Sequence, residues 1–191
     1  MLTWLKKDRS LMGLQNRAII LTLLTTGLRA QELCNLQSKD LEVDTDTEMM
    51  YVNGIGKGEK PFRQEIHANA VYAIGEAFKA KFKRDPRPSE YLLHSNGTGR
   101  LQKGIMWIRL SEIGKALKSA GVIRSDVEFS AHLFRRTYLT VLSKAGMSLG
   151  SLQSCARHSN VSTTFNHYVD SQESTKPYLD KALFGTKEKA K

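Results

Sequence analysis

The stretch TGLRAQEL, residues 26–33, marks the point at which a long apolar helix ends and a short helix begins. The apolar run over residues 14–26 predicts a buried helix, and Gly27 is typical of a helix C-terminus. Arg29 then opens the second helix, where its guanidinium can bind a phosphate whose charge the helix N-terminus also favours. Glu32, one turn later, can brace that arginine by a hydrogen bond. By itself, the pattern also fits an ordinary surface Arg–Glu pair.

The remaining chain predicts a small sheet followed by more helices. Short apolar runs separated by Asp/Thr and Gly/Lys turn residues predict antiparallel hairpins over residues 41–43, 49–52 and 62–66. Apolar residues at helical spacing and glycine punctuation predict helices over residues 29–37, 69–83, 102–120, 131–145, 148–156 and 161–169. No strand alternates regularly with helices, which disfavours a doubly wound parallel sheet. The expected fold class is mainly α with a small antiparallel β-sheet (α+β).

Composition narrows the class of protein. The 191 residues suit one domain, and a 40% hydrophobic content argues against general disorder. The longest apolar run, residues 18–28, is far shorter than the ~20 residues that span a bilayer, and Cys34 and Cys155 make no disulfide framework. The net charge of +10, from 29 Lys and Arg against 19 Asp and Glu, points to a polyanion such as nucleic acid. A protein that merely happens to be basic is the alternative.

A glycine-rich turn lies between two of the expected strands. Residues 54–60 read GIGKGEK, and glycines permit a tight turn that approaches a ligand closely. Lys57 at the tip can reach a phosphate or a minor groove. The sequence does not match a phosphate-binding loop, which needs Gly-Lys-Ser/Thr before a helix. A plain flexible hairpin tip explains the same residues.

The stretch HLFRRT, residues 132–137, combines a histidine with an arginine one turn later. Because positions i and i+3 share a helix face, His132 and Arg135 can converge on one small anion. Leu133 and Phe134 then point into the core. A structural histidine is the alternative reading.

The stretch RHSNVSTTFNHY, residues 157–168, carries His158 at a helix boundary and Tyr168 ten residues later. A tyrosine phenolate can attack phosphorus, but its ordinary pKa near 10 requires cationic neighbours or a base. A zinc site formed by Cys155, His158 and His167 is the alternative. It lacks the paired ligand spacing of structural zinc sites.

In this order and at these spacings, the four patterns resemble the catalytic domain of the tyrosine recombinases, the phage-integrase family. TGLRAQEL is similar to the family's first-arginine box and GKGEK to its β-hairpin lysine. HLFRRT is similar to its His-x-x-Arg box, and HSNVSTTFNHY to its segment from histidine to tyrosine. The resemblance runs from about residue 14 to residue 169.

The resemblance implies an anion clamp. Arg29 and Arg135 would hold the scissile phosphate, and His132 and His158 would bind its non-bridging oxygens or assist proton transfer. Glu32 takes the position of a supporting residue. Guanidinium groups suit this task because their planar fork binds phosphate oxygens bidentately.

The resemblance also implies the covalent chemistry. Tyr168 would be the nucleophile that forms a 3′-phosphotyrosine, and Lys57 the general acid that protonates the leaving 5′-hydroxyl. Lys60 competes with Lys57 for the acid role, and Lys57 is favoured because it follows the glycine at the turn tip. No metal and no other cofactor is implied. Lys60, Arg136 and Arg157 are expected to contact DNA; Arg136 stands where the family often has histidine, and Arg157 where it usually has glycine.

The expected organisation is a catalytic domain over residues 1–175 and a C-terminal helix and tail over residues 176–191. In the family such a helix docks on a neighbouring protomer, and packing on its own domain is the alternative. Only about 13 residues precede the first expected helix. The N-terminal DNA-binding domain that family members usually carry is therefore expected to be absent, through truncation or because the protein is a short member.

The resemblance implies a site-specific recombinase or integrase that cleaves and rejoins DNA strands. The alternatives are a type IB topoisomerase-like relaxation activity and a DNA-binding regulator without turnover. The implied partners are double-stranded DNA, three further copies in a homotetramer on DNA, and accessory DNA-bending proteins, with no membrane. We expect a cytoplasmic, nucleoid-associated protein of bacterial, archaeal or phage origin.

Overall fold

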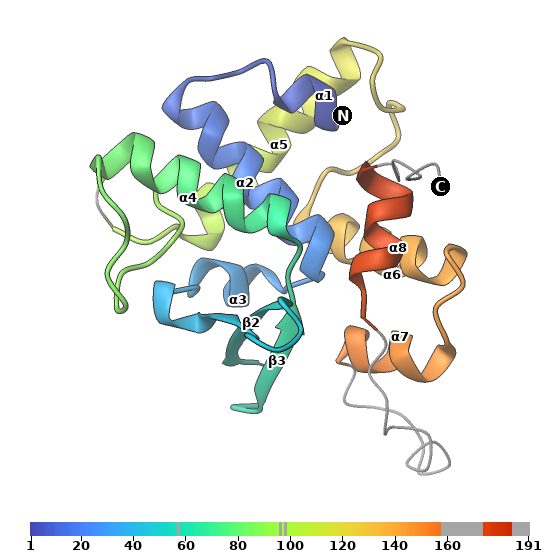
Figure 1. Cartoon of the computed structure of the whole chain (residues 1–191). Helices are drawn as coiled ribbons and strands as arrows, with labels where there is room; N and C mark the ends of the chain where they lie inside the picture. Colours follow the sequence, from blue (N-terminus) through green and yellow to red (C-terminus); the bar gives the residue numbers. More distant parts are fainter. Residues whose placement is uncertain (57, 96, 98, 158–173, 185–191) are drawn as a thin grey trace, which may run out of the picture.

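The fold is mainly helical, with one small sheet beside the central helix (Figure 1). A computed structural model describes residues 1–56, 58–95, 97, 99–157 and 174–184. Its elements are α1 (Leu2–Leu5), α2 (Leu11–Thr26), α3 (Ala30–Cys34), η1 (Ser38–Asp40), β1 (Leu41–Val43), β2 (Met50–Ile55), β3 (Pro61–Glu65), α4 (Ala68–Phe82), α5 (Lys103–Ser119), α6 (Ala131–Lys144), α7 (Leu149–Ala156), α8 (Lys176–Leu179) and η3 (Asp180–Phe184). This confirms the expected α+β class. The helix expected over residues 161–169 lies outside the described residues.

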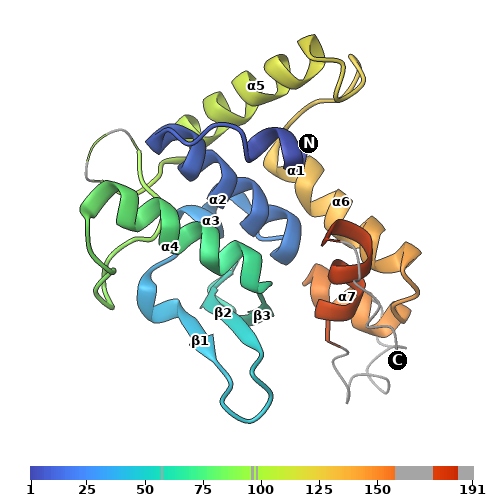
Figure 2. The ribbon, with the colours of Figure 1, turned by 45° about the horizontal axis from the view of Figure 1, so that its top comes forward.

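Helix α2 is the central element of the core. The Ser10 hydroxyl accepts a hydrogen bond from the backbone N–H of Gly13 and caps its N-terminus. The helix ends at Gly27, whose φ of 61° lies in the left-handed region. Its residues are buried on nearly every side, because α4 packs on one face and α6 on another (Figure 2). The end of α2 is therefore held inside the molecule.

The three strands form an antiparallel sheet in the order β1-β2-β3. In the β2–β3 hairpin Tyr51 pairs with Glu65 and Ile55 with Pro61. The backbone N–H of Gly56 donates to the carbonyl of Lys60 at 2.8 Å and closes the base of the turn. The hairpins expected from the turn chemistry are thus confirmed.

The C-terminal segment packs on its own domain. The Glu65 carboxylate, at the end of β3, accepts hydrogen bonds from the backbone N–H groups of Thr175 and Lys176 at the start of α8. In η3, a π-helical turn, Asp180 lies 2.7 Å from Nε2 of His67 and Phe184 stacks on the same imidazole. The described part of this segment, residues 174–184, thus contacts its own domain, and docking on a neighbouring protomer stays a prediction.

A second apolar cluster joins α8 to α6 and α7. Its buried members are Tyr138, Leu142, Met147, Cys155 and Leu179. This cluster fixes the end of α7 beside the end of α2, which is where the candidate site lies. Among the described residues, no helix is long and apolar enough to cross a membrane.

Candidate active site

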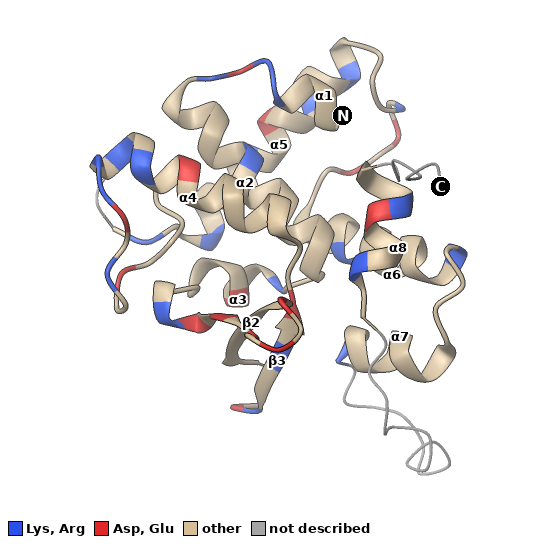
Figure 3. Ribbon diagram, viewed as in Figure 1, with Lys and Arg blue, Asp and Glu red and all other residues tan. Residues whose placement is uncertain are grey.

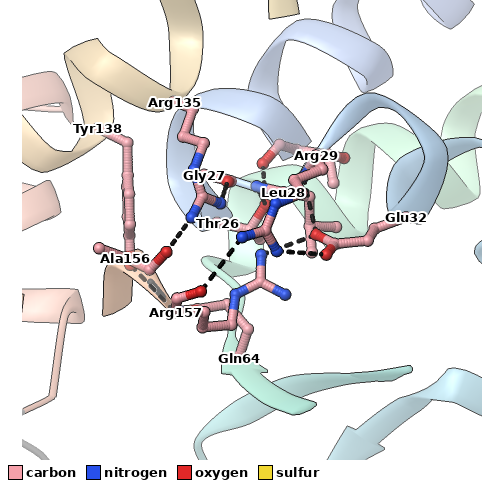
Figure 4. Close-up of polar contacts among 11 residues, drawn as sticks. Thr26, Gly27, Leu28, Arg29, Glu32, Gln64, Arg135, Tyr138, Ala156 and Arg157 are labelled. Carbon is pink, nitrogen blue, oxygen red and sulfur yellow. Dashed lines mark hydrogen bonds and ion pairs between the residues drawn. The ribbon is translucent and has the colours of Figure 1, made fainter. Parts of the chain in front are cut away.

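Arg29 lies in the short connection between α2 and α3, as the N-cap residue of α3. Its backbone N–H donates to Oε2 of Glu32 at 2.8 Å, and its Nη1 donates to Oε1 of the same carboxylate at 2.9 Å. Its Nη2 donates to the carbonyl oxygen of Arg157 at 3.1 Å. The side chain keeps 33% of its surface exposed. Arg29 is therefore anchored by Glu32 and by the carbonyl of Arg157 (Figure 4), while part of its side chain stays exposed.

Arg135 reaches the same place from α6. Its Nη1 donates to the carbonyl of Gly27 at 2.6 Å, and its Nη2 donates to the carbonyl of Ala156. The side chain thereby ties α6 to the ends of α2 and α7. Burial, together with the nearby charges of Arg29 and Arg157, lowers the pKa of Arg135 to about 10. The guanidinium stays protonated near neutral pH.

Arg157 is the third guanidinium of the cluster. It follows the last residue of α7 with a φ of 46°, and its Nη2 donates to Oε2 of Glu32 at 2.8 Å. The guanidinium carbon lies 4.2 Å from the centre of the Phe62 ring, a cation–π contact. Only 13% of the side chain is exposed. We expected this residue to face DNA; the structure instead places its guanidinium against Glu32 and Phe62.

Glu32 is the carboxylate that both Arg29 and Arg157 bind. Burial opposes its ionisation, but the hydrogen bonds from Arg29 and the charge of Arg157 outweigh burial, so its pKa is lowered. Three guanidinium groups against this one carboxylate leave a formal excess of two positive charges among these four residues. Such a cluster, open at Arg29, is a site for an anion with several oxygens.

The structure places the other expected site residues as follows. His132 and Arg136 are exposed on α6, and among the described residues neither makes a hydrogen bond or ion pair with the side chains of the arginine cluster. Lys60 is exposed at the base of the β2–β3 turn. A Cβ at Gly56, in the same turn, would lie 3.3 Å from Oε1 of Glu32, so this hairpin approaches the cluster. Lys57, His158 and Tyr168 lie outside the described residues, as does His167 of the alternative zinc site.

The sequence model of the phage integrase family matches residues 2–175. The chain belongs to the phage integrase family. Its match covers every residue of the expected catalytic set, whose individual roles stay predictions.

Several curated members of the family are similar to this chain. Tyrosine recombinase XerC of Bacillus pumilus is 32% identical over 155 residues, which cover 80% of this chain and 48% of the relative. Tyrosine recombinase XerA of Thermococcus onnurineus is 31% identical over 153 residues, which cover 78% of this chain and 49% of the relative. The chain spans about half the length of the curated relatives it matches.

Solved structures of recombinases share the fold. The crystal structure of XerA recombinase gives a TM-score of 0.63 at 24% identity, covering 94% of this chain and 59% of that structure. The XerH site-specific recombinase bound to its difH substrate gives 0.66 at 20% identity, covering 83% of this chain and 44% of that structure.

Three features of this candidate site were not found by reading the sequence. Arg135 binds the backbone carbonyl groups of Gly27 and Ala156. Every residue has such a carbonyl, so the sequence could not identify these two as partners of an arginine. The inward direction of Arg157 was also missed, although its position directly after a helix end is a signal for a special backbone conformation. Phe62, an apolar residue of an expected strand, gave no hint that it covers a guanidinium.

Proposed function

We propose that this chain is the DNA-cleaving and rejoining domain of a site-specific recombinase. The observation that carries the proposal is the meeting of Arg29 and Arg135, from segments more than one hundred residues apart, in one cluster with excess positive charge. The oxygens of a phosphodiester gain negative charge in the pentacoordinate transition state. Guanidinium groups fixed in advance stabilise that charge, which is the larger part of catalysis in many enzymes.

The proposed reaction is a transesterification in two symmetrical halves. The Tyr168 hydroxyl passes its proton to a base, His132 or His158, and its oxygen attacks the phosphorus. The bond from phosphorus to O5′ breaks, and Lys57 gives a proton to the departing oxygen. The 3′-phosphotyrosine keeps the energy of the broken bond, so that a 5′-hydroxyl can reverse the step with neither ATP nor a metal. His132 and His158 would bind non-bridging oxygens or move protons. The approach of Gly56 to Glu32 supports the assignment of Lys57, its neighbour in sequence.

The proposed partner is double-stranded DNA, with exposed Lys60 and Arg136 on its phosphates. The net charge of +10 supports this, as do structures of similar fold solved with DNA, among them XerH with difH. Because such contacts release counterions, affinity should fall steeply with salt. We further propose a homotetramer on DNA, assisted by DNA-bending proteins. Since relatives of this family are bacterial and archaeal, we expect the protein at the nucleoid of such a cell.

A covalent-trapping experiment tests this function. The full chain is incubated with a nicked suicide duplex, from which the cleaved fragment diffuses away, and the protein–DNA adduct is measured on a denaturing gel. The wild type should form the adduct, and Tyr168→Phe should form none, because the nucleophilic oxygen is gone. Binding without any adduct from the wild type would favour the regulator, and relaxation of supercoiled DNA without exchange would favour the topoisomerase-like activity.

Tyr138→Phe is the matched control, since it removes the same atom from another tyrosine. The Tyr138 hydroxyl accepts a hydrogen bond from Gln64 at 3.0 Å, and burial raises its pKa well above the ordinary value. It is therefore a poor nucleophile. The control should still form the adduct, and loss of the adduct in Tyr138→Phe alone would contradict the assignment.

A further inference from the structure

Arg157 occupies a position that its backbone does not favour for an arginine. Its φ of 46° is left-handed, a region that only glycine adopts without strain. The backbone N–H of Arg157 caps the end of α7, and the contacts of its largely buried side chain add to what holds the residue there. We propose that Arg157 is a positioning residue, which holds Glu32 and Arg29 so that the Arg29 guanidinium faces the scissile phosphate.

The contacts form a closed ring of three hydrogen bonds (Figure 4). Arg29 donates from Nη1 to Glu32, Arg157 donates from Nη2 to Glu32, and Arg29 donates from Nη2 to the Arg157 carbonyl. Both Nη atoms of Arg29 are thus fixed, and its guanidinium cannot turn about the bond from Cδ to Nε without breaking the ring. A guanidinium has five N–H donors, so three remain for a phosphate.

Charge gives the second reason. Without Arg157, Glu32 would pair with Arg29 alone, and the pair would be formally neutral toward an incoming phosphate. With Arg157 bound to the other carboxylate oxygen, the three residues keep one net positive charge. Arg157 therefore acts on the phosphate through Glu32 and Arg29.

The Arg157 side chain is largely buried within the protein, and only a small part of it faces solvent. The guanidinium covers Phe62, and its Nε and Nη1 are buried with no hydrogen-bond partner among the described residues. Nothing in this arrangement turns it toward solvent, where an exposed DNA-binding arginine would lie. Its role is therefore that of a support for Arg29.

Replacement by glycine gives a clean test, because glycine tolerates the left-handed backbone and keeps the carbonyl that binds Arg29. The catalytic part of this test rests on the proposed function. Under single turnover at saturating suicide duplex, Arg157→Gly should cleave about 10- to 100-fold more slowly, a loss of the size seen when a partner that orients a metal ligand is removed. The Kd for DNA should change less than about threefold, as expected when an orientation is lost rather than a DNA contact.

Two further variants separate positioning from a general structural role. Arg157→Lys should recover part of the cleavage rate, because an ammonium still pairs with Glu32. In a Glu32→Gln background, Arg157→Gly should slow cleavage less than about threefold, because its effect passes through the carboxylate. Lys83→Gly is the matched control, since Lys83 is an exposed left-handed residue at the end of α4. Wild-type cleavage by Arg157→Gly, or equal slowing by Lys83→Gly, would overturn the inference.

A side-chain NMR measurement decides the inference without cleavage. In the wild type, the Nη–H signals of Arg29 should be resolved, because its guanidinium is held in the ring. In Arg157→Gly the Arg29 guanidinium should rotate, so that its Nη–H signals average. In Lys83→Gly these signals should stay resolved. Resolved Arg29 signals in Arg157→Gly would overturn the inference even if the wild type cleaves DNA. A wild type that forms no covalent adduct would instead overturn the proposed function, while the spectra still decide the role of Arg157.

Discussion

Gly27 serves the site in two ways that no other residue could combine. Its left-handed backbone ends α2 and turns the chain toward Arg29. Its carbonyl accepts the hydrogen bond from Arg135. The ring of Tyr138 lies where a side chain at this position would be, so α6 approaches the backbone of Gly27 directly. A single glycine thus allows the two arginines to meet.

Replacement of Gly27 by alanine should destabilise the fold. A Cβ here would lie 2.5 Å from Cδ1 of Tyr138, and the left-handed backbone alone costs about 1–2 kcal/mol for a residue with a Cβ. Gly121 is the matched control, because it has a φ of 67° but no atom within 4 Å of its added Cβ among the described residues. In thermal unfolding by circular dichroism, Gly27→Ala should lower the Tm further than Gly121→Ala. Equal Tm changes would contradict the close packing of α6 on Gly27.

Glu32 should make the stability of the protein depend on pH. Its pKa in the folded state is lowered, so it stabilises the fold fully above its unfolded pKa, about 4.5. That contribution is lost as pH falls below 4.5 through the lower folded pKa. Urea unfolding between pH 7 and pH 3 should show a free energy of unfolding that falls in the acid range. Glu32→Gln should be less stable at pH 7, by about 1–3 kcal/mol, and its acid decline should be smaller. An unchanged decline would contradict the ionised Glu32.

At the scale of elements, local signals in the sequence were sufficient wherever an element is determined by its own residues. The apolar run of α2 with its terminal glycine, and the Gly/Lys turn between β2 and β3, gave the right element types. Helix α1 and the π-helical turn η3 were not predicted as such. Both are short, and η3 depends on His67, which lies more than one hundred residues away in sequence. Contacts of this kind leave no local pattern.

The hydrogen bonds between the end of β3 and the start of α8 give a prediction at the scale of elements. The Glu65 carboxylate binds the Ser174 hydroxyl and two backbone N–H groups at the start of α8. Glu65→Ala should therefore speed amide hydrogen exchange over residues 174–184 at least about tenfold, because hydrogen bonds to a charged group are lost. Glu42→Ala is the control, since Glu42 binds Asn53 and Arg63 on the sheet. Equal exchange in the two variants would contradict this attachment.

At the scale of the whole molecule, the site exists because distant segments end at one point. The end of α2, the first half of α6, the end of α7 and the β2–β3 hairpin meet around Glu32 and its arginines. Lys and Arg also gather elsewhere, for example near the end of α4, so charge by itself does not locate the site (Figure 3).

The sequence predicted one part of this site and missed another. The ordered motifs resemble those of one family, and that resemblance was sufficient to predict that Arg29 and Arg135 meet. The resemblance could not predict that the Arg157 side chain points into the protein. Its direction depends on which side of the α7 C-terminus faces Glu32 and Phe62. Only the packing of three helices and a hairpin determines it.

The most direct test of the account is the structure of the full chain trapped on a suicide DNA duplex. We predict one phosphate, joined covalently to the Tyr168 oxygen, with guanidinium nitrogens of both Arg29 and Arg135 at about 2.7–2.9 Å from its oxygens. A phosphate joined to another residue, or one bound away from Arg29 and Arg135, would contradict the account.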